Sequence, residues 1–247
     1  LDAASAEFET YFVNEREKNV GTATNDNFGS VNTLGLRGSA QPMQGFYTYA
    51  ELAYQFGRRG VDPAGVLAAG EGQQAWAADL GADYTFANVA TSPKLGAEWR
   101  FYSGKKTPAG QGVGGWGPVA PGYFTNALRE FQTQSTVVGF YPTDHANVTS
   151  SGTNQHEFAL YSSFSPIEDL TVSPRLAWFM LDEEVAPQSG AKPNGFLGTE
   201  WDTNVVYNYT EDVQLGLLYA LFAPGNAFRE PADATAQELV TTVSVKF

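Results

Sequence analysis

The chain has 247 residues, enough for one β domain with a wide interior. With 26 glycines, 14% aromatic and only 17% charged residues, it is unlike a helical enzyme, for which about 25% charged residues would be usual. The net charge of -13 argues against nucleic-acid binding, which needs lysine and arginine clustered along one face.

Other broad features narrow the class further. No apolar run approaches the roughly 20 residues that a spanning helix needs, which excludes a helical membrane protein. The lack of cysteine removes thiol nucleophiles, disulfides and thiolate metal sites. The start, Leu1–Ser5, lacks a basic segment and an apolar run, so we expect any signal peptide to be removed or to lie outside this sequence. We expect one domain over 1–247, with no cofactor and no metal.

Apolar and polar residues alternate over segments of about ten residues, a pattern typical of transmembrane β-barrels. In 45–57, for example, Leu52 and Phe56 share one face, while Glu51 and Gln55 share the other. Ten such strands are predicted, at 6–14, 31–40, 45–57, 74–86, 94–102, 155–165, 169–182, 198–209, 212–223 and 236–247.

A soluble β-sandwich would also alternate, with its apolar face turned inward. Aromatic side chains at segment ends favour the barrel, because lipid-facing bands end in aromatic girdles. Such pairs are Tyr84 with Phe86, Trp99 with Phe101, and Tyr207 with Tyr209.

Connection lengths give a second test, because outer-membrane barrels alternate short periplasmic turns with long external loops. The short connections are 41–44, 87–93, 166–168 and 210–211, and the long ones are 15–30, 58–73, 103–154, 183–197 and 224–235. The two kinds alternate throughout. We therefore predict an all-β fold, an antiparallel transmembrane β-barrel of the bacterial outer membrane, with a long external loop around 103–154 and both termini in the periplasm.

The segment Leu239–Phe247 resembles the C-terminal signal of outer-membrane proteins, an alternating strand that closes on an aromatic residue. The alternative is an ordinary edge strand that ends in Phe247. The expected partners are outer-membrane lipid and lipopolysaccharide around the barrel and the outer-membrane assembly machinery at Phe247. A periplasmic partner is left open, and no nucleic acid is expected.

Several stretches resemble the alginate export family of bacterial outer-membrane β-barrels. They are Thr33–Ser39, Glu51–Gly57, Ala75–Gly81, Lys94–Gly104, Gly198–Asp202 and Phe222–Phe228. The resemblance implies a barrel that acts as a channel, although members need not carry alginate. Members have about eighteen strands, whereas this chain offers about ten, or twelve if 124–141 adds two. The chain is then either the C-terminal part of a larger barrel or a smaller relative.

Motifs that suggest other chemistry have simpler interpretations. Residues 110–115 match a dinucleotide-binding pattern, but they lie in a long loop with no helix to receive a pyrophosphate. The only histidines are His145 and His156, and a barrel enzyme would need one of them beside a correctly placed partner such as Ser162 or Ser163. The acids of 182–184 show no calcium-binding spacing and are interpreted as a solvated charge run. We expect no enzyme.

The face opposite the aromatic series is predicted to line the lumen. Its acids are Glu7, Glu9, Glu51, Asp79, Asp83, Glu98, Glu157, Glu200, Asp202 and Glu238, and its bases are Arg37, Lys94, Arg100, Arg175 and Lys246. Most of these charges are expected to brace the wall as pairs. A conduit for a polyanion would instead gather arginines at its narrowest point, with Arg37, Arg100 and Arg175 as candidates. Two functions stay open: a conduit for an anionic polysaccharide, and a general or cation-preferring porin. A rim-active enzyme is a third, less favoured alternative.

Overall fold

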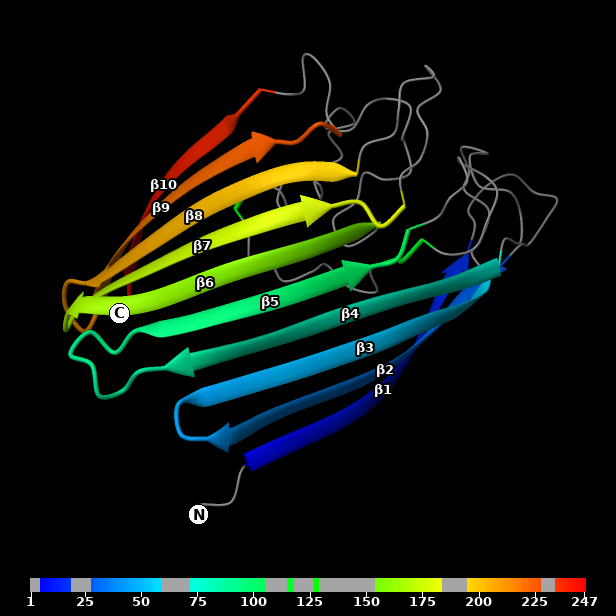
Figure 1. The fold of residues 1–247 in the computed structure, drawn as a ribbon, viewed down its shortest axis with the longest axis horizontal. Helices are drawn as coiled ribbons and strands as arrows, with labels where there is room; N and C mark the ends of the chain where they lie inside the picture. The colour runs from blue at the N-terminus through cyan, green and yellow to red at the C-terminus, as the bar shows by residue number, and fades with distance from the viewer. Residues whose placement is uncertain are drawn as a thin grey trace.

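The computed structural model describes residues 5–18, 28–58, 72–104, 115–117, 127–128, 154–183, 195–227 and 234–247. These residues form one antiparallel sheet of ten strands in sequence order (Figure 1). The strands are β1 (Ser5–Lys18), β2 (Phe28–Met43), β3 (Phe46–Arg58), β4 (Gly72–Thr85), β5 (Lys94–Tyr102), β6 (Gln155–Ile167), β7 (Leu170–Met180), β8 (Phe196–Asn208), β9 (Val213–Pro224) and β10 (Ala236–Val245). In the described residues, no helix is long and apolar enough to cross a membrane.

All ten predicted strands are present, and their ends differ from the prediction by a few residues. The largest difference is in β1, which continues to Lys18 and pairs with the start of β2. Its last residues, 15–18, alternate in the sign of their charge rather than in hydropathy, so the sequence pattern stops early. At the other end of the chain, β10 stops at Val245, before Phe247. The candidate strands of 124–141 lie outside the described residues, apart from 127–128.

The sheet is curved and open (Figure 1). Among the described residues, β1 pairs only with β2 and β10 only with β9. Short turns join the strands at one end, where β1 begins and β10 ends, and the strand ends that the long connections join are at the other end (Figure 1). The tight turn between β2 and β3 places Gly45 at a φ of +82°, a backbone conformation that glycine adopts without a steric penalty.

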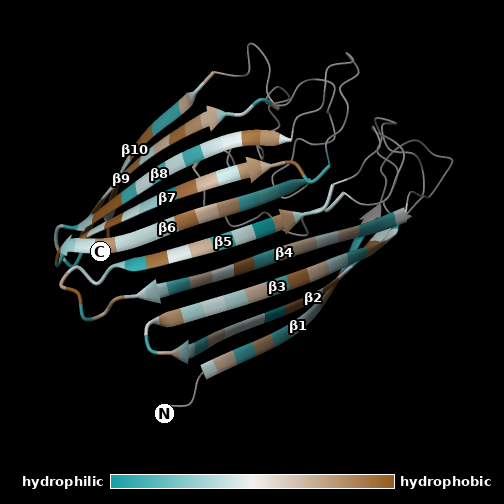
Figure 2. Ribbon diagram, in the orientation of Figure 1, coloured by the Kyte–Doolittle hydropathy of each residue, from teal (hydrophilic) through white to brown (hydrophobic). Residues whose placement is uncertain are grey.

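Alternation along each strand divides the sheet into two faces, and the bands of Figure 2 follow this period. The outer face exposes large apolar side chains, which belong in lipid rather than in water. They include Phe8, Phe12, Leu34, Leu52, Trp76, Leu95, Phe158, Leu160, Trp201, Leu217, Leu239 and Val243. This pattern excludes a sandwich with its apolar face turned inward.

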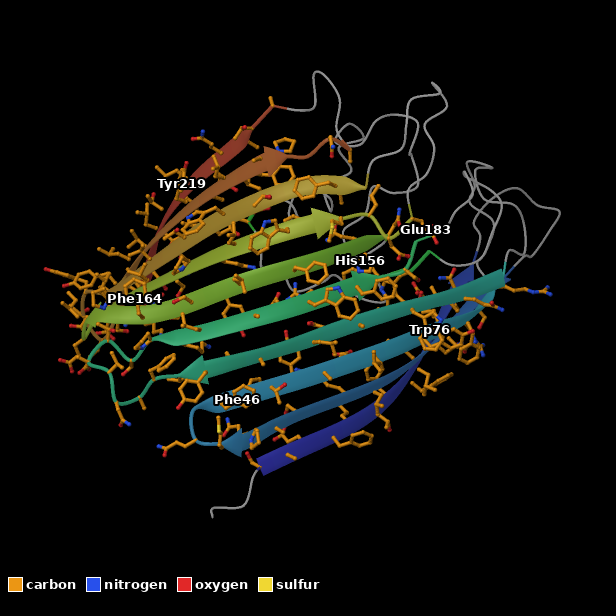
Figure 3. The ribbon with its side chains drawn as sticks, viewed as in Figure 1. Phe46, Trp76, His156, Phe164, Glu183 and Tyr219 are labelled. Atoms are coloured by element: carbon orange, nitrogen blue, oxygen red, sulfur yellow. The ribbon has the colours of Figure 1, made fainter. Side chains whose placement is uncertain are left out.

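Aromatic residues gather at both ends of the outer face, as the sequence predicted. At the short-turn end, the rings of Tyr84 and Phe86 lie 4.8 Å apart, and those of Tyr207 and Tyr209 lie 6.4 Å apart. Figure 3 places Phe46 and Phe164 at the same end, and Trp76 and His156 toward the long connections. Two aromatic bands flank an apolar one, as in barrels that cross a bilayer.

Candidate functional site

The inner face carries a charged row that crosses six neighbouring strands. Residues directly opposite one another, from β1 to β6, are Glu9, Arg37, Glu51, Asp79, Arg100 and Glu157. Four of the five facing pairs have opposite charges, which attract each other and favour this register, whereas Glu51 and Asp79 are two acids that face each other. The ten residues predicted to face the lumen all lie on the same face of the sheet as this row; that this face lines a lumen stays a prediction.

Two arginines are the centre of a buried ion-pair network. Arg175 Nη2 lies 2.5 Å from Glu98 Oε1 and 2.6 Å from Glu157 Oε1. Arg100 contacts the same two carboxylates, at 3.2 Å to Glu98 and 3.9 Å to Glu157, and its Nε lies 3.5 Å from Asp79 Oδ2. The Glu157 side chain is fully buried and that of Glu98 is 7% exposed. The three carboxylates exceed the two guanidinium groups by one charge.

Three tyrosines donate hydrogen bonds to inner acids. Tyr11 donates a hydrogen bond to Glu51 Oε1 at 2.6 Å, Tyr49 to Asp79 Oδ1 at 3.1 Å, and Tyr161 to Asp83 Oδ2 at 3.1 Å.

Each tyrosine ring lies over a glycine on the paired strand. A Cβ at Gly35, Gly81 or Gly96 would lie 1.9, 2.4 or 2.2 Å from the nearest ring atom. The repeated motif packs a tyrosine flat against the wall because the glycine leaves room for its ring.

The arginine candidates do not form one ring. Arg100 and Arg175 converge on Glu98 and Glu157, whereas Arg37 is exposed and is separated from Arg100 by β3 and β4. The positive charge of the two buried arginines is compensated by carboxylates within 4 Å. They therefore brace the wall, which was the structural interpretation of these charges.

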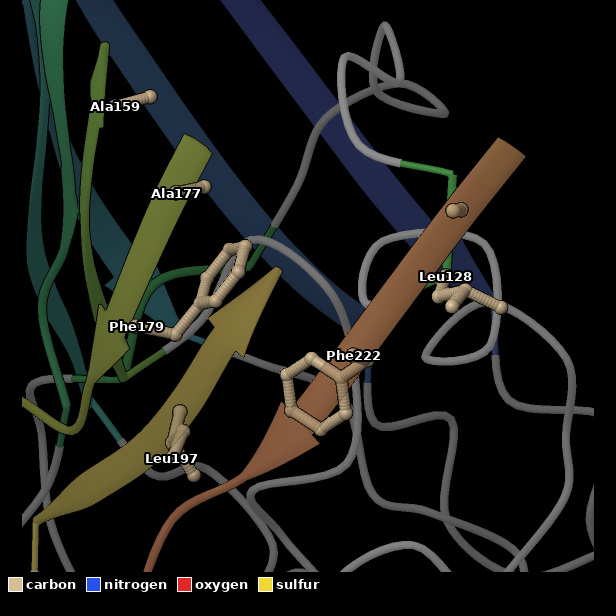
Figure 4. Packing of buried hydrophobic residues seen from close by; sticks show 7 residues of the cluster. Leu128, Ala159, Ala177, Phe179, Leu197 and Phe222 are labelled. Atoms are coloured by element: carbon tan, nitrogen blue, oxygen red, sulfur yellow. The ribbon is translucent and has the colours of Figure 1, made fainter. Parts of the chain in front are cut away.

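Glu200 and Asp202 have a role that sequence reasoning missed. Leu128 donates its backbone N–H to Glu200 Oε1 at 2.6 Å, and Ala127 donates to Asp202 Oδ2 at 3.1 Å. The Leu128 side chain fills an apolar socket on the inner face (Figure 4). The socket is formed by Ala159, Ala177, Phe179, Leu197, Ala220 and Phe222.

A β-bulge helps to shape this socket. Phe179 faces Gly198 and Met180 faces Phe196, so Leu197 is the extra residue on β8. A bulge redirects side chains locally, and here Leu197 is buried beside Phe179 and Phe222.

A second piece of the same connection contacts the opposite part of the wall. Gln55 Nε2 donates to the Gly117 carbonyl at 2.6 Å, and Gln55 Oε1 accepts from the Gly117 N–H at 3.1 Å. Gln73 Nε2 donates to the Gly115 carbonyl at 2.7 Å. Trp116, between them, packs on small inner residues, Ala53, Ala75 and Ala77.

The external side of the 103–154 connection stays a prediction. Two of its described pieces, 115–117 and 127–128, lie against the inner face of the sheet, which the sequence did not predict. The signal in the sequence was a set of small residues at inward positions of β3, β4, β6 and β7, which leave space for another segment.

The other motifs of the sequence form no active site in the described part of the chain. His156 lies on the outer face, where its Nδ1 accepts a hydrogen bond from Trp99 Nε1 at 3.3 Å and its ring is 4.8 Å from that of Phe101. Ser163 is on the opposite face, where Ser173 donates to it. Ser162 is six residues along β6 from His156, about 20 Å away in a strand. Residues 110–114 and His145 lie outside the described residues.

The interpretation of 182–184 as a solvated charge run is wrong for Asp182. Its Oδ2 accepts the Gly104 N–H at 2.8 Å, and its Oδ1 lies 3.3 Å from His156 Nε2. The carboxylate links the ends of three strands, β5, β6 and β7. Within the described residues, no group of three or more acids and histidines is arranged to hold a metal ion.

Comparison with known proteins agrees with this architecture. No curated protein gives a significant match to the chain. A profile of the family described as Alginate export matches residues 3–242, nearly the whole chain. The ten-stranded antiparallel sheet, its lipid-type outer face and this match together establish that the chain belongs to the alginate export family of outer-membrane β-barrels.

Proposed function

We propose that the chain forms an outer-membrane channel that passes a polar solute and prefers small cations to small anions. The family is a transport family rather than an enzyme family. The observation that carries the ion preference is the pairing of Arg100 and Arg175 with buried carboxylates. Because these carboxylates offset the positive charge of the two arginines, the arginines attract a passing anion only weakly.

The exposed charges of the inner strands support the same preference. At inner strand positions, the described exposed acids are Glu7, Glu9 and Glu15, and the described exposed base is Arg37; Lys246, just after β10, is a second exposed base. The sign of the charge along a pore biases which ions enter it.

A second function, export of an anionic polysaccharide, is favoured by the family match. Aromatic and polar side chains of the inner face, such as Tyr11 and Tyr49, offer a sugar chain both stacking surfaces and hydrogen-bonding groups. A rim-active enzyme has less support, because the described His156 faces outward with no serine beside it.

Reversal potentials under a salt gradient test the proposal. The purified protein is reconstituted into a planar bilayer, and we expect a cation-selective potential. Glu9→Gln should weaken this selectivity and Arg37→Gln should strengthen it. Arg16→Gln is the matched control, because Arg16 is exposed on the outer face of the same strand as Glu9.

Clear anion selectivity that is lost in Arg37→Gln would contradict the cation preference and favour the polyanion conduit. Absence of conductance in every variant would contradict the channel itself.

Outer-membrane location and partners belong to the same proposal. Lipid and lipopolysaccharide would surround the exposed apolar face, and the assembly machinery would read the C-terminal segment that ends in Phe247. The support is the aromatic bands at both ends of the outer face. Protease and antibody access in whole cells tests it, since the long connections should be reached from outside and the short turns should not.

A further inference from the structure

We propose that two segments between β5 and β6, residues 115–117 and 127–128, form a built-in constriction of the lumen, and that Glu200, Asp202, Gln55 and Gln73 are the positioning residues that hold them there. The inference rests on the proposed channel function and adds which residues set the width of the pore.

The first docking point is on β6 to β9, and its two carboxylates are both on β8. Glu200 is 1% exposed and Asp202 is 6% exposed, and each accepts a backbone N–H from the connection, from Leu128 and Ala127 respectively. Hydrogen bonds to charged acceptors are stronger than those between neutral groups. A buried carboxylate that lost its donor would carry an uncompensated desolvation cost, so the contact favours the docked position.

Apolar packing strengthens this docking point. Leu128 is 5% exposed, and the socket around it combines small alanines with the rings of Phe179 and Phe222, as Figure 4 shows. An apolar patch on the inner face of a polar channel would be wetted if it were left open. Leu128 covers it, which makes the docked position favourable by the hydrophobic effect as well.

The second docking point is on β3 and β4, and β5 separates these strands from those of the first. Gln55 is fully buried and pairs with both the N–H and the carbonyl of Gly117, as a neighbouring strand would. Gln73 donates to Gln55 Oε1 as well as to the Gly115 carbonyl, so the two amides support each other. Trp116 is 9% exposed on the alanines beneath it.

These contacts narrow the lumen at the end of the long connections. Gln55 is close to the end of β3, Gln73 close to the start of β4, and Glu200 close to the start of β8. Both docking points therefore lie at the same level of the sheet, on separate parts of its wall. Trp116 and Leu128 occupy inner surface that a solute would otherwise contact.

A thiol reporter tests the docking without depending on conductance. The natural chain has no cysteine, so Leu128→Cys introduces a single one. A water-soluble maleimide should label it slowly in the otherwise unchanged protein. Adding Glu200→Ala should raise the labelling rate about tenfold, because loss of a hydrogen bond to a charged group shifts an equilibrium by about this factor. Glu200→Gln retains an acceptor oxygen and should give a much smaller increase.

Conductance provides the second measurement. Glu200→Ala combined with Asp202→Ala should increase the single-channel conductance and admit larger neutral sugars, whereas Gln237→Ala, a change on the outer face of β10, should not. Heat-modifiable migration on gels checks that each variant is folded.

The possible results separate the two proposals. The constriction would be overturned by a protein that conducts, but whose labelling rate is unchanged by Glu200→Ala and whose conductance is unchanged by Glu200→Ala with Asp202→Ala. A labelling rate that rises as expected in a protein that never conducts would uphold the docking and reject the channel.

Discussion

Tyr11 of β1 reaches across β2 to Glu51 of β3. Its hydroxyl donates to Glu51 Oε1 at 2.6 Å, and its ring lies over Gly35 on the intervening strand. Three consecutive strands are joined by one side chain, in addition to their backbone ladders. The contact couples the edge of the described sheet to its interior.

Replacing Tyr11 with Phe should lower the free energy of unfolding by about 1–2 kcal/mol, because a partly buried carboxylate loses its donor. Urea titration of the protein in detergent or lipid measures the change. Glu51→Gln keeps an acceptor for the same hydroxyl and should cost less. Equal stability of Tyr11→Phe and the unmodified protein would mean that the bond contributes nothing across β2.

Space for the tyrosine rings gives a second prediction. Gly81→Ala should destabilise the protein by about 1–3 kcal/mol, because its Cβ would lie 2.4 Å from Tyr49 Cε1 and the ring would have to leave its position. Gly38→Ala is the control, since its Cβ would lie 3.5 Å from the nearest atom, an ordinary contact. If both substitutions shift the urea midpoint equally, the fit of tyrosine over glycine has no structural importance.

Adjacent valines on β8 test the assignment of the two faces. Val205 faces Val172 and Leu217 on the outer side, whereas Val206 faces Thr171 and Gly216 on the inner side. Val205→Lys should cost up to about 2–4 kcal/mol, according to its depth in the bilayer, because the charge enters lipid. Val206→Lys should cost much less. Refolding yield into vesicles and heat-modifiable migration measure both, and the reverse order of tolerance would mean that the faces are exchanged.

The strands could be predicted because their signal is local. Every inward residue of β3, for instance, is two positions from the next, so alternation alone separates Glu51 and Gln55 from Leu52 and Phe56. The same parity placed all ten charged candidates on the inner face before any contact was known. It could not tell which charges meet, because Arg175 reaches Glu98 two strands away.

The docking of the long connection could not be predicted for a related reason. Gln55 contacts Gly117 and Glu200 contacts Leu128 across separations of 62 and 72 residues, and nothing periodic marks such pairs. Small residues at inward positions, such as Ala75 and Ala177, were a usable signal that another segment packs on the inner face. In the structure both alanines are fully buried although their side chains are small. In a wall that faces only solvent, they would be exposed.

The ion-pair network supports a final prediction, that Glu98→Ala destabilises the protein far more than Glu9→Ala. Glu98 Oε1 contacts both Arg175 and Arg100, and its side chain is 7% exposed. Its removal leaves two guanidinium groups with less compensation in a buried site, which typically costs about 3–5 kcal/mol. We expect the lower part of this range, because Arg175 keeps Glu157 and Arg100 keeps Asp79.

Glu9 is exposed on the same face and should tolerate the change, with an effect within about 0.5 kcal/mol. Urea unfolding at 0.1 M and 1 M salt separates the two further, because salt screens exposed charges and has little effect on buried pairs. Similar losses for both variants at both salt concentrations would show that the buried network does not brace the wall.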